Sequence, residues 1–239
     1  GQMLKSMGVP NDQIARWTGL LGLAWAFKAL WSPFMELAPS RRLAVVACQL
    51  IGGACLALVA LALQLPMWFA LCIALLAIVS LASSTHDIVA DGIYIASLDA
   101  REQAAYAGWQ GAFFNAAKFI SLGGLLILAG ALEQRFGIEA AWTTVFLLLG
   151  GLMALLGLYH VRALPNPSAT PEAGGAARSL GAIKGTLVDV IKTFFAKPGI
   201  WMAILFIILF RAGEGQIQSI GPLFLRDARE VGGLGLTTA

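Results

Sequence analysis

The sequence predicts an all-α fold, a polytopic bundle of membrane-spanning helices, and three observations support this. Hydrophobic residues make up 59% of the 239 positions and charged residues only 12%, whereas soluble domains carry about 25% charged residues. The apolar residues come in blocks near the roughly 20 residues that a helix needs to cross the hydrocarbon core. The blocks lack the alternation that a membrane β-barrel requires. Helices also satisfy their own backbone hydrogen bonds, which is necessary in lipid because no water is present to do so.

The sequence divides into six candidate spans, most of them joined by short connections. The clearest is Leu43–Leu63, which reads LAVVACQLIGGACLALVALAL without a charge, and the weakest is Trp17–Met35, which contains Lys28. Short connections make successive helices antiparallel. We expect spans at about 17–35, 43–63, 66–96, 104–132 and 140–160 within residues 1–161, and one more at Pro198–Leu225 within residues 198–239.

Residues 162–197 are expected to connect two bundles on the cytoplasmic side. Arg162–Ser179 is rich in proline, alanine and glycine, which favours a flexible linker, although an ordinary long loop is the alternative. The following stretch, Leu180–Lys197, places apolar residues at helical spacing and leaves Lys184, Asp189 and Lys192 off that stripe. This pattern predicts an amphipathic helix on the membrane surface.

Basic residues in the loops predict the orientation, because cytoplasmic loops carry an excess of lysine and arginine. The net charge of +3 agrees with this bias, and nothing in the sequence suggests a nucleic-acid partner. The expected partner is the lipid bilayer. The loops expected in the cytoplasm hold Arg41, Arg42, Arg101, Arg162, Arg178, Lys184, Lys192 and Lys197, and the opposite loops hold Lys5, Arg135, Arg226 and Arg229.

Lys118 is the first candidate for a residue that binds solute. It follows Gln110 and Asn115 in GWQGAFFNAAKFISLGG, and Gln110, Phe114 and Lys118 share one helix face. The position is close to the middle of the membrane, where a lysine should point into the bundle and meet an anion. We therefore expect these side chains to line a cavity. A purely structural ion pair is the alternative.

Asp87 and Asp91 form a second candidate site, because carboxylates four residues apart share a helix face. Mutual repulsion favours a proton on one of them, as a proton-coupled carrier would need. Asp87 lies roughly 31 Å along the helix from Pro66, near the cytoplasmic boundary. A structural tie from these aspartates to Arg41 or Arg42 is at least as well supported.

A third candidate site lies in the last span, within RAGEGQIQSIGP. Arg211, Glu214 and Gln218 are three and four residues apart and share a face, while neighbouring glycines and a proline weaken the helix. A broken polar helix that lines a cavity is typical of carriers. The alternative is an Arg211–Glu214 pair that only neutralises itself.

The remaining polar residues point to no catalysis. Lys28 and Arg16 lie near span ends, where snorkelling to water is the expected behaviour. His86 and His160 are isolated in the sequence, so we expect no metal site. No phosphate loop, nucleophile elbow or zinc spacing occurs. We expect neither an enzyme nor a cofactor.

Two stretches resemble the major facilitator superfamily, and within it the AmpG-type permeases and the related acetyl-CoA transporters. STHDIVADGIYIASLDAREQAAYAGWQGAFFNAAK (Ser84–Lys118) resembles that family's fourth-helix QDIxxD segment, with Asp87, Ile88 and Asp91 matching and His86 in place of glutamine. FKALWSPFMELAPSRR (Phe27–Arg42) resembles the loop after the family's second helix, where a cytoplasmic gate lies. Glu36, Arg41 and Arg42 would belong to that gate; Glu36 replaces the usual aspartate, and Ala38–Ser40 replaces the Gly-Arg step.

The resemblance implies a partial major facilitator fold that covers helices two to seven of twelve, so that residues 1–161 form a half bundle lacking its first helix. It also implies transport of a small solute by alternating access, usually proton-coupled, with a muropeptide (anhydro-sugar peptide) as the analogous substrate. The expected location is the bacterial inner membrane. The alternatives are a non-transporting membrane sensor or scaffold, or an inactive transporter fragment.

Overall fold

The computed structural model describes residues 1–35, 38, 40–166 and 180–238. Within the helices of the last range, some side chains are outside the description, namely those of 180–184, 186, 187, 190, 211, 212, 214, 216 and 219. The chain divides into two compact units. The first comprises Gly1–Pro167 and Leu236–Ala239, and the second comprises Ser168–Gly235.

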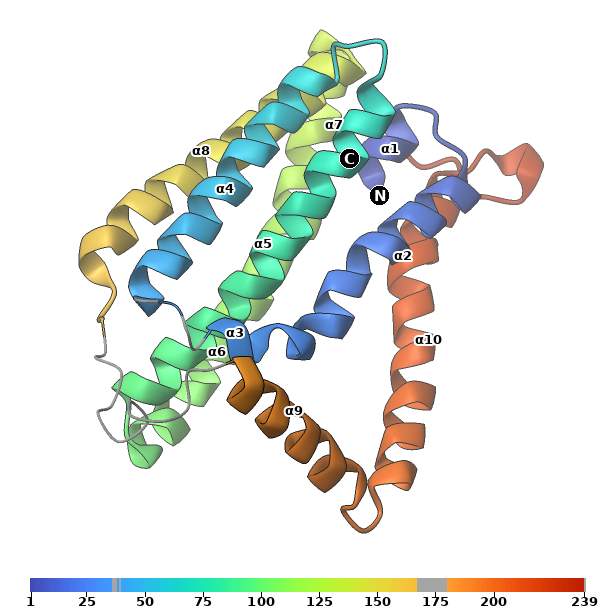
Figure 1. The fold of residues 1–239 in the computed structure, drawn as a ribbon. Coiled ribbons are helices and arrows are strands. Elements are labelled where there is room, and N and C mark those ends of the chain that lie inside the picture. The colour runs from blue at the N-terminus through green and yellow to red at the C-terminus, as the bar shows by residue number, and fades with distance from the viewer. Residues whose placement is uncertain (36–37, 39, 167–179, 239) are drawn as a thin grey trace. The chain divides into compact units, whose positions relative to one another are not determined.

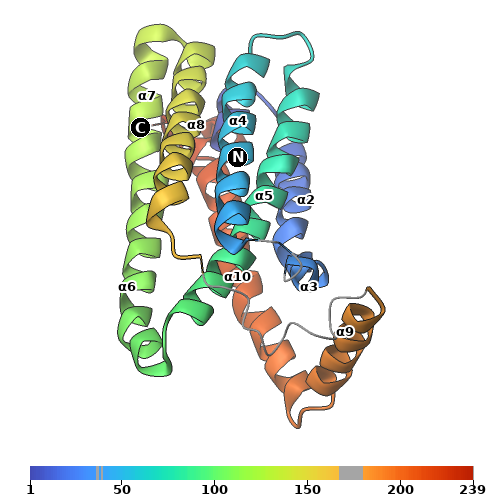
Figure 2. The same ribbon diagram turned by 60° about the vertical axis from the view of Figure 1, so that its left-hand side comes forward.

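The first unit is built from helices, and its long helices are α4, α5, α6 with its continuation α7, and α8 (Figures 1 and 2). Shorter elements precede α4 along the chain. In order, the helices are α1 (Gln2–Ser6), α2 (Asn11–Phe27), the 3₁₀ turn η1 (Lys28–Leu30), α3 (Ser32–Met35), α4 (Arg41–Ala62), α5 (Trp68–Ser97), α6 (Ala100–Phe119), the π-helical segment η2 (Ile120–Gly124), α7 (Leu125–Phe136) and α8 (Ile138–Ala163).

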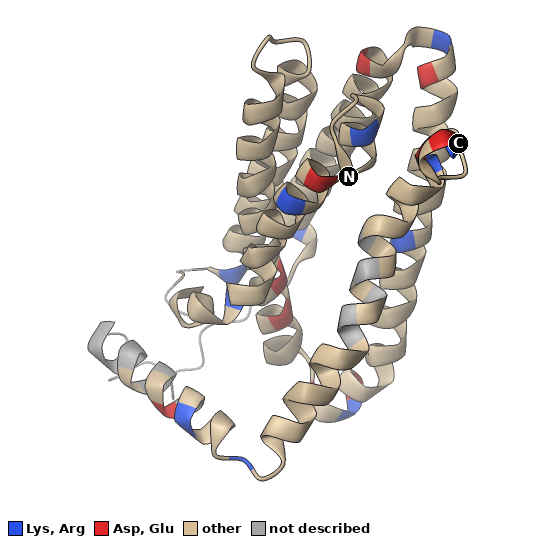
Figure 3. Cartoon of the chain, turned by 90° about the vertical axis from the view of Figure 1, so that its right-hand side faces the viewer, with Lys and Arg blue, Asp and Glu red and all other residues tan. Residues whose placement is uncertain are grey.

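Four helical stretches among the described residues are long and apolar enough to cross a membrane. They are Arg41–Ala62, Trp68–Ser97, Ala100–Phe136 and Ile138–Ala163. Figure 3 shows that most of the helical surface carries neither acidic nor basic side chains. The chain is a multi-pass integral membrane protein, and the predicted all-α bundle of membrane helices is confirmed.

The core of the first unit is the contact of α4 with α5 on one side and α8 on the other (Figure 1). Gly53 of α4 faces Gly150 of α8, and a Cβ added to either would lie within 3 Å of the other's carbonyl oxygen. Small residues allow such close approach of membrane helices. Val59 and Ala60 of α4 are fully buried in the same unit, so this face of α4 is packed against protein.

Pairwise contacts give the helix directions. Trp17 packs against Phe69 with ring centroids 6.2 Å apart, and Ser80 donates to the carbonyl oxygen of Leu21 over 2.6 Å. Residue numbers therefore rise together along α2 and α5, which run parallel. In contrast, α4 and α8 run antiparallel, because Thr143 donates to the carbonyl of Ala60 whereas Gly150 meets Gly53.

These directions bring five helix termini to one end of the first unit, here called the basic end. It comprises the C-termini of α2, α5 and α8 and the N-termini of α4 and α6. Ser40, just before α4, donates to the side-chain oxygen of Asn166, just after α8, over 2.9 Å, which places those two termini together. Arg41, Arg42, Arg101 and Arg162 all belong to these termini. Several of the basic residues from which the orientation is predicted are therefore gathered at this end.

The expected span 17–35 is not one continuous helix. The helix α2 begins earlier, at Asn11, and ends at Phe27, after which the chain continues through the η1 turn into α3. Pro33 lies in the first turn of α3, where the backbone N–H that proline lacks would have no partner within the helix. Proline inside a helix breaks it, so a helix that arrives from α2 cannot continue through Pro33. The consequence is that Lys28 begins a turn at the basic end.

The expected span 104–132 lies within a longer stretch, Ala100–Phe136, of 37 residues. A capping box fixes its start, since Asp99 accepts from the backbone N–H of Glu102 and the Glu102 side chain accepts from that of Asp99. The π-helical segment η2 interrupts the stretch. Its two parts differ in packing: α7 packs against α8, whereas α6 contains no buried residue.

The second unit holds α9 (Leu180–Phe195), α10 (Ile200–Arg226) and the 3₁₀ turn η4 (Arg229–Val231). Gly199, at φ 77°, separates the first two helices, and glycine adopts this left-handed conformation without strain. The expected linker residues 167–179 lie outside the described residues. The expected surface helix 180–197 is helical from Leu180 to Phe195, and its off-stripe Lys184 has no described side chain.

Candidate functional site

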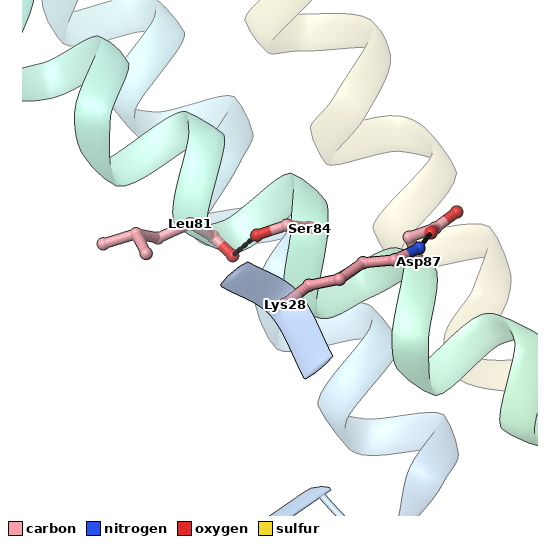
Figure 4. Close-up of polar contacts among 4 residues, drawn as sticks. All are labelled: Lys28, Leu81, Ser84 and Asp87. Carbon is pink, nitrogen blue, oxygen red and sulfur yellow. Dashed lines mark hydrogen bonds and ion pairs between the residues drawn. The ribbon is translucent and has the colours of Figure 1, made fainter. Parts of the chain in front are cut away.

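An ion pair joins two helices at the basic end of the first unit. Lys28, the first residue of η1, donates from its Nζ to Oδ2 of Asp87 on α5 over 2.5 Å (Figure 4). The two side chains are 37% and 36% exposed, so water reaches the pair. One turn back on α5, the buried Ser84 donates to the carbonyl oxygen of Leu81 over 3.1 Å. Because Asp87 pairs with Lys28, its charge joins α5 to the turn that follows α2.

This pair corrects the expectation that Lys28 extends into water. It also bears on the aspartates, for which a structural tie to Arg41 or Arg42 was one interpretation and proton transfer the other. The parallel packing of α2 and α5 brings Lys28 to Asp87. Arg41 donates from its Nη1 to the carbonyl oxygen of Gly92 over 3.2 Å, and the buried Nε of Arg42 has no hydrogen-bond partner within the described part of the chain.

A pocket of about 360 Å³ opens beside the ion pair. Lys28, Arg41 and Asp91 contribute charged groups to its wall, and Met35 and Ile95 contribute apolar ones. Asp87 and Asp91 share a face of α5, as their spacing predicts. The pocket therefore combines two cations and a carboxylate at the end of the unit that the basic residues mark.

The expected gate is only partly described. Glu36 lies outside the described residues. Arg41 and Arg42 begin α4, whose N-cap is Ser40. Of these two arginines, only Arg41 lines the pocket that contains Lys28 and Asp91.

Lys118 lies on α6, as the middle residue of the 37-residue stretch Ala100–Phe136. Its Nζ is 5.7 Å from the ring centroid of Phe114, one turn away on the same face, which is a distance at which a cation is attracted to a ring. Asn115 donates to the carbonyl of Gly111 over 2.9 Å, and Gln110 is exposed. No ion pair of Lys118 occurs among the described residues.

The third candidate site belongs to the second unit. Arg211, Glu214 and Gln218 lie on α10, which contains Pro222 as expected for a weakened helix. The side chains of Arg211 and Glu214 are outside the described residues, and that of Gln218 is exposed. Whether these three side chains form one face of a cavity therefore stays a prediction.

Sequence reasoning missed one polar contact. His160 on α8 and the buried Gln49 on α4 lie 2.9 Å apart between Nδ1 and Oε1. No group of three metal-ligating side chains occurs among the described residues. The sequence signal for the contact of His160 with Gln49 was the presence of a glutamine and a histidine within otherwise apolar spans.

The fold and these charged groups define an integral membrane protein with several spans and intramembrane polar side chains. The chain is distantly similar to the anhydromuropeptide permease of Escherichia coli K12, with 28% identity over 228 aligned residues. The permease of the same description from Escherichia coli O157:H7 matches equally well. The match covers 89% of this chain but only 42% of each relative, so the chain spans less than half the length of these proteins.

Two further comparisons gave no match. No protein-family model matches the chain, and no solved structure resembles it significantly. The distant similarity to the permeases supports the expected partial bundle of the major facilitator type.

Proposed function

We propose that the chain is part of a carrier that moves a small solute across a membrane by alternating access. The observation that supports this most is the similarity to anhydromuropeptide permeases over 89% of the chain. A muropeptide-like solute, an anhydro-sugar linked to a peptide, is the proposed substrate class. Proton-coupled import across the bacterial inner membrane is the proposed direction and location.

The placement of Lys118 supports a solute site within the span. A lysine at mid-membrane depth is costly unless it meets an anion or a water-filled cavity. The proposed role of Lys118 is to bind an anionic group of the solute, with Gln110 and Asn115 as neighbouring polar groups. A muropeptide carries carboxylates on its peptide, which match this charge. Arg211, Glu214 and Gln218 are proposed to contribute from α10.

The similarity to a permease also argues against an enzyme. The groups described so far are ion pairs and hydrogen bonds at helix contacts, and such groups suit binding and conformational change better than bond cleavage. A permease needs only to bind its solute alternately from two sides.

Uptake of labelled anhydromuropeptide into cells that express the full-length protein tests the proposal. We expect uptake above vector controls, and little uptake of a free sugar or an unrelated drug. Lys118→Gln should reduce uptake at least tenfold while membrane expression persists, because it removes the cation and keeps a polar side chain. Arg101→Gln, at the start of the same helix, is the matched control and should retain uptake. Uptake that Lys118→Gln leaves unchanged would remove Lys118 from the solute site.

A further inference from the structure

The ammonium group of Lys28 has a second carboxylate within reach. Asp91 lies one helical turn beyond Asp87, about 6 Å along the axis of α5, and on the same face. Lys28 and Asp91 line the same pocket. Within the described residues, Lys28 is bonded to Asp87, and no hydrogen bond or ion pair of the Asp91 carboxylate is found. One lysine therefore faces two acids.

The other charges around the pair are fixed in place or lie further away. The helix α5 packs against α2, η1, α3 and α4. On α4, Arg41 donates a hydrogen bond to the carbonyl oxygen of Gly92, and Arg42 is its neighbour at the N-terminus of the helix. On α5 itself, His86 precedes Asp87. The charged residues of α2, which are Asp12 and Arg16, lie toward the opposite end of that helix.

Among these cations, Lys28 has the most flexible side chain. A lysine carries a compact charge on a flexible stem of four carbons, whereas the planar guanidinium of an arginine is held more rigidly by its hydrogen bonds. The side chains of Lys28 and Asp87 are each more than a third exposed, so water and protons reach them. Lys28 also begins the η1 turn, where a regular helix has already ended.

We infer that Lys28 is a counter-ion shared between Asp87 and Asp91, and that its transfer between them is the proton-coupling step of the carrier. In the arrangement that the structure describes, Lys28 pairs with Asp87 and the unpaired Asp91 carries the proton, because a carboxylate paired with a cation holds a proton less well than an unpaired one. Loss of that proton to water leaves Asp91 charged, and the ammonium group moves from Asp87 to Asp91. A proton from water then adds to Asp87, which has lost its cation, so no covalent bond changes except the O–H bonds that carry the proton.

The transfer would move the ammonium group by one turn of α5, about 6 Å along its axis. The charge that joins η1 to α5 would then sit at Asp91, closer to the C-terminus of α5. Because α5 also packs against α4, a change in this tie at the basic end would be felt in the rest of the unit. This step rests on the proposed transport function, whereas the sharing of Lys28 by two carboxylates does not.

Thermal unfolding of the purified full-length protein in detergent tests the sharing without any solute. Asp87→Asn and Asp91→Asn alone should each lower the Tm by about 2 °C or less, because Lys28 keeps one partner. The double variant should lower it by more than the sum of the two single changes, and adding Lys28→Gln should restore part of the loss, since it removes the unpaired cation. Asp12→Asn is the matched control. Additive effects of the two single changes, or no rescue by Lys28→Gln, would overturn the sharing.

Transport in proteoliposomes tests the coupling step. With labelled anhydromuropeptide, Lys28→Gln and Asp87→Asn should lose at least tenfold in accumulation driven by a proton gradient. Exchange of labelled for unlabelled solute without a gradient should stay within about twofold of the unchanged protein. Equal loss of both activities, or retention of both, would overturn the coupling role. If the unchanged protein moves none of this solute, the proposed function fails, while the unfolding experiment still decides whether Lys28 is shared.

Discussion

Gly53 on α4 and Gly150 on α8 stand so close that a Cβ on Gly53 would lie 2.9 Å from the carbonyl oxygen of Gly150. The reverse distance, from a Cβ on Gly150 to the carbonyl oxygen of Gly53, would be 2.7 Å. Real Cβ atoms do not approach backbone oxygens this closely, and a backbone cannot move aside as a flexible side chain can. The contact between these two helices therefore depends on the absence of side chains at both positions.

Gly150→Val should destabilise the protein markedly. The added side chain forces α8 away from α4, and overpacking of this kind costs about 1–3 kcal/mol. For a chain of this size, we expect the Tm in detergent to fall by roughly 2–4 °C for each kcal/mol. Gly151→Val is the matched control, since a Cβ there meets nothing within 4 Å. Equal losses for the two variants would show that the glycine contact is not what limits the helix approach.

The start of α6 should depend on its capping box. The Asp99 side chain accepts a hydrogen bond of 2.8 Å from the backbone N–H of Glu102. The Glu102 side chain accepts one of 3.0 Å from the backbone N–H of Asp99. Asp99→Ala removes the cap and should cost about 1 kcal/mol, within the range measured for such changes. Asp99→Asn keeps an acceptor oxygen and should behave like the unchanged protein. Helix content and Tm in detergent are the measurements, and an asparagine variant as unstable as the alanine variant would argue against capping.

The contact of His160 with Gln49 should show as a coupling energy. Gln49 is buried, and its Oε1 lies 2.9 Å from Nδ1 of His160. Gln49→Leu leaves the histidine without this partner and should cost about 1–3 kcal/mol. The double change Gln49→Leu with His160→Leu should cost less than the sum of the single changes. A double-mutant cycle on the Tm measures this, and strictly additive values would mean that the two side chains do not interact.

Much of the bundle could be predicted from the sequence, because hydropathy and length depend only on local composition. The spans of α4 and α8, and the first half of α5, follow from long apolar runs. The partner of Asp87 could not be predicted in this way. Lys28 is distant in sequence, and it meets Asp87 only because α2 and α5 pack in parallel and α2 ends at Phe27. The position of Asp87 near the expected cytoplasmic boundary had suggested Arg41 or Arg42, which begin α4, as its structural partner.

The interruption of the span expected at 104–132 was also beyond sequence reasoning. The run ISLGG looks like an ordinary apolar stretch with two glycines, yet it forms the π-helical segment η2. A π turn holds one residue more than an α turn, so it depends on how the two flanking segments are anchored and leaves no pattern of its own. Lys118 is the middle residue of Ala100–Phe136, and its mid-membrane depth, inferred from span length, stays a prediction.

Deletion of Ser121 should convert η2 to regular α-helix and leave α6 in its present register with α7, because the π turn holds one residue more than an α turn. The part of the stretch that packs against α8 should keep its place, because Trp142 of α8 donates to Glu133 of α7 over 2.7 Å. The face that carries Lys118 should therefore keep its direction. We expect the variant to reach the membrane and to retain solute uptake.

The reactivity of a cysteine placed at position 118 tests this register without any solute. In a background with Cys48, Cys55 and Cys72 replaced, Lys118→Cys should react with a membrane-impermeant thiol reagent at a rate that the Ser121 deletion leaves unchanged. Ser121→Ala keeps the residue count and serves as the control, with an unchanged rate expected. If the deletion changes the rate and the substitution does not, η2 has not absorbed the lost residue, and α6 has turned relative to α7.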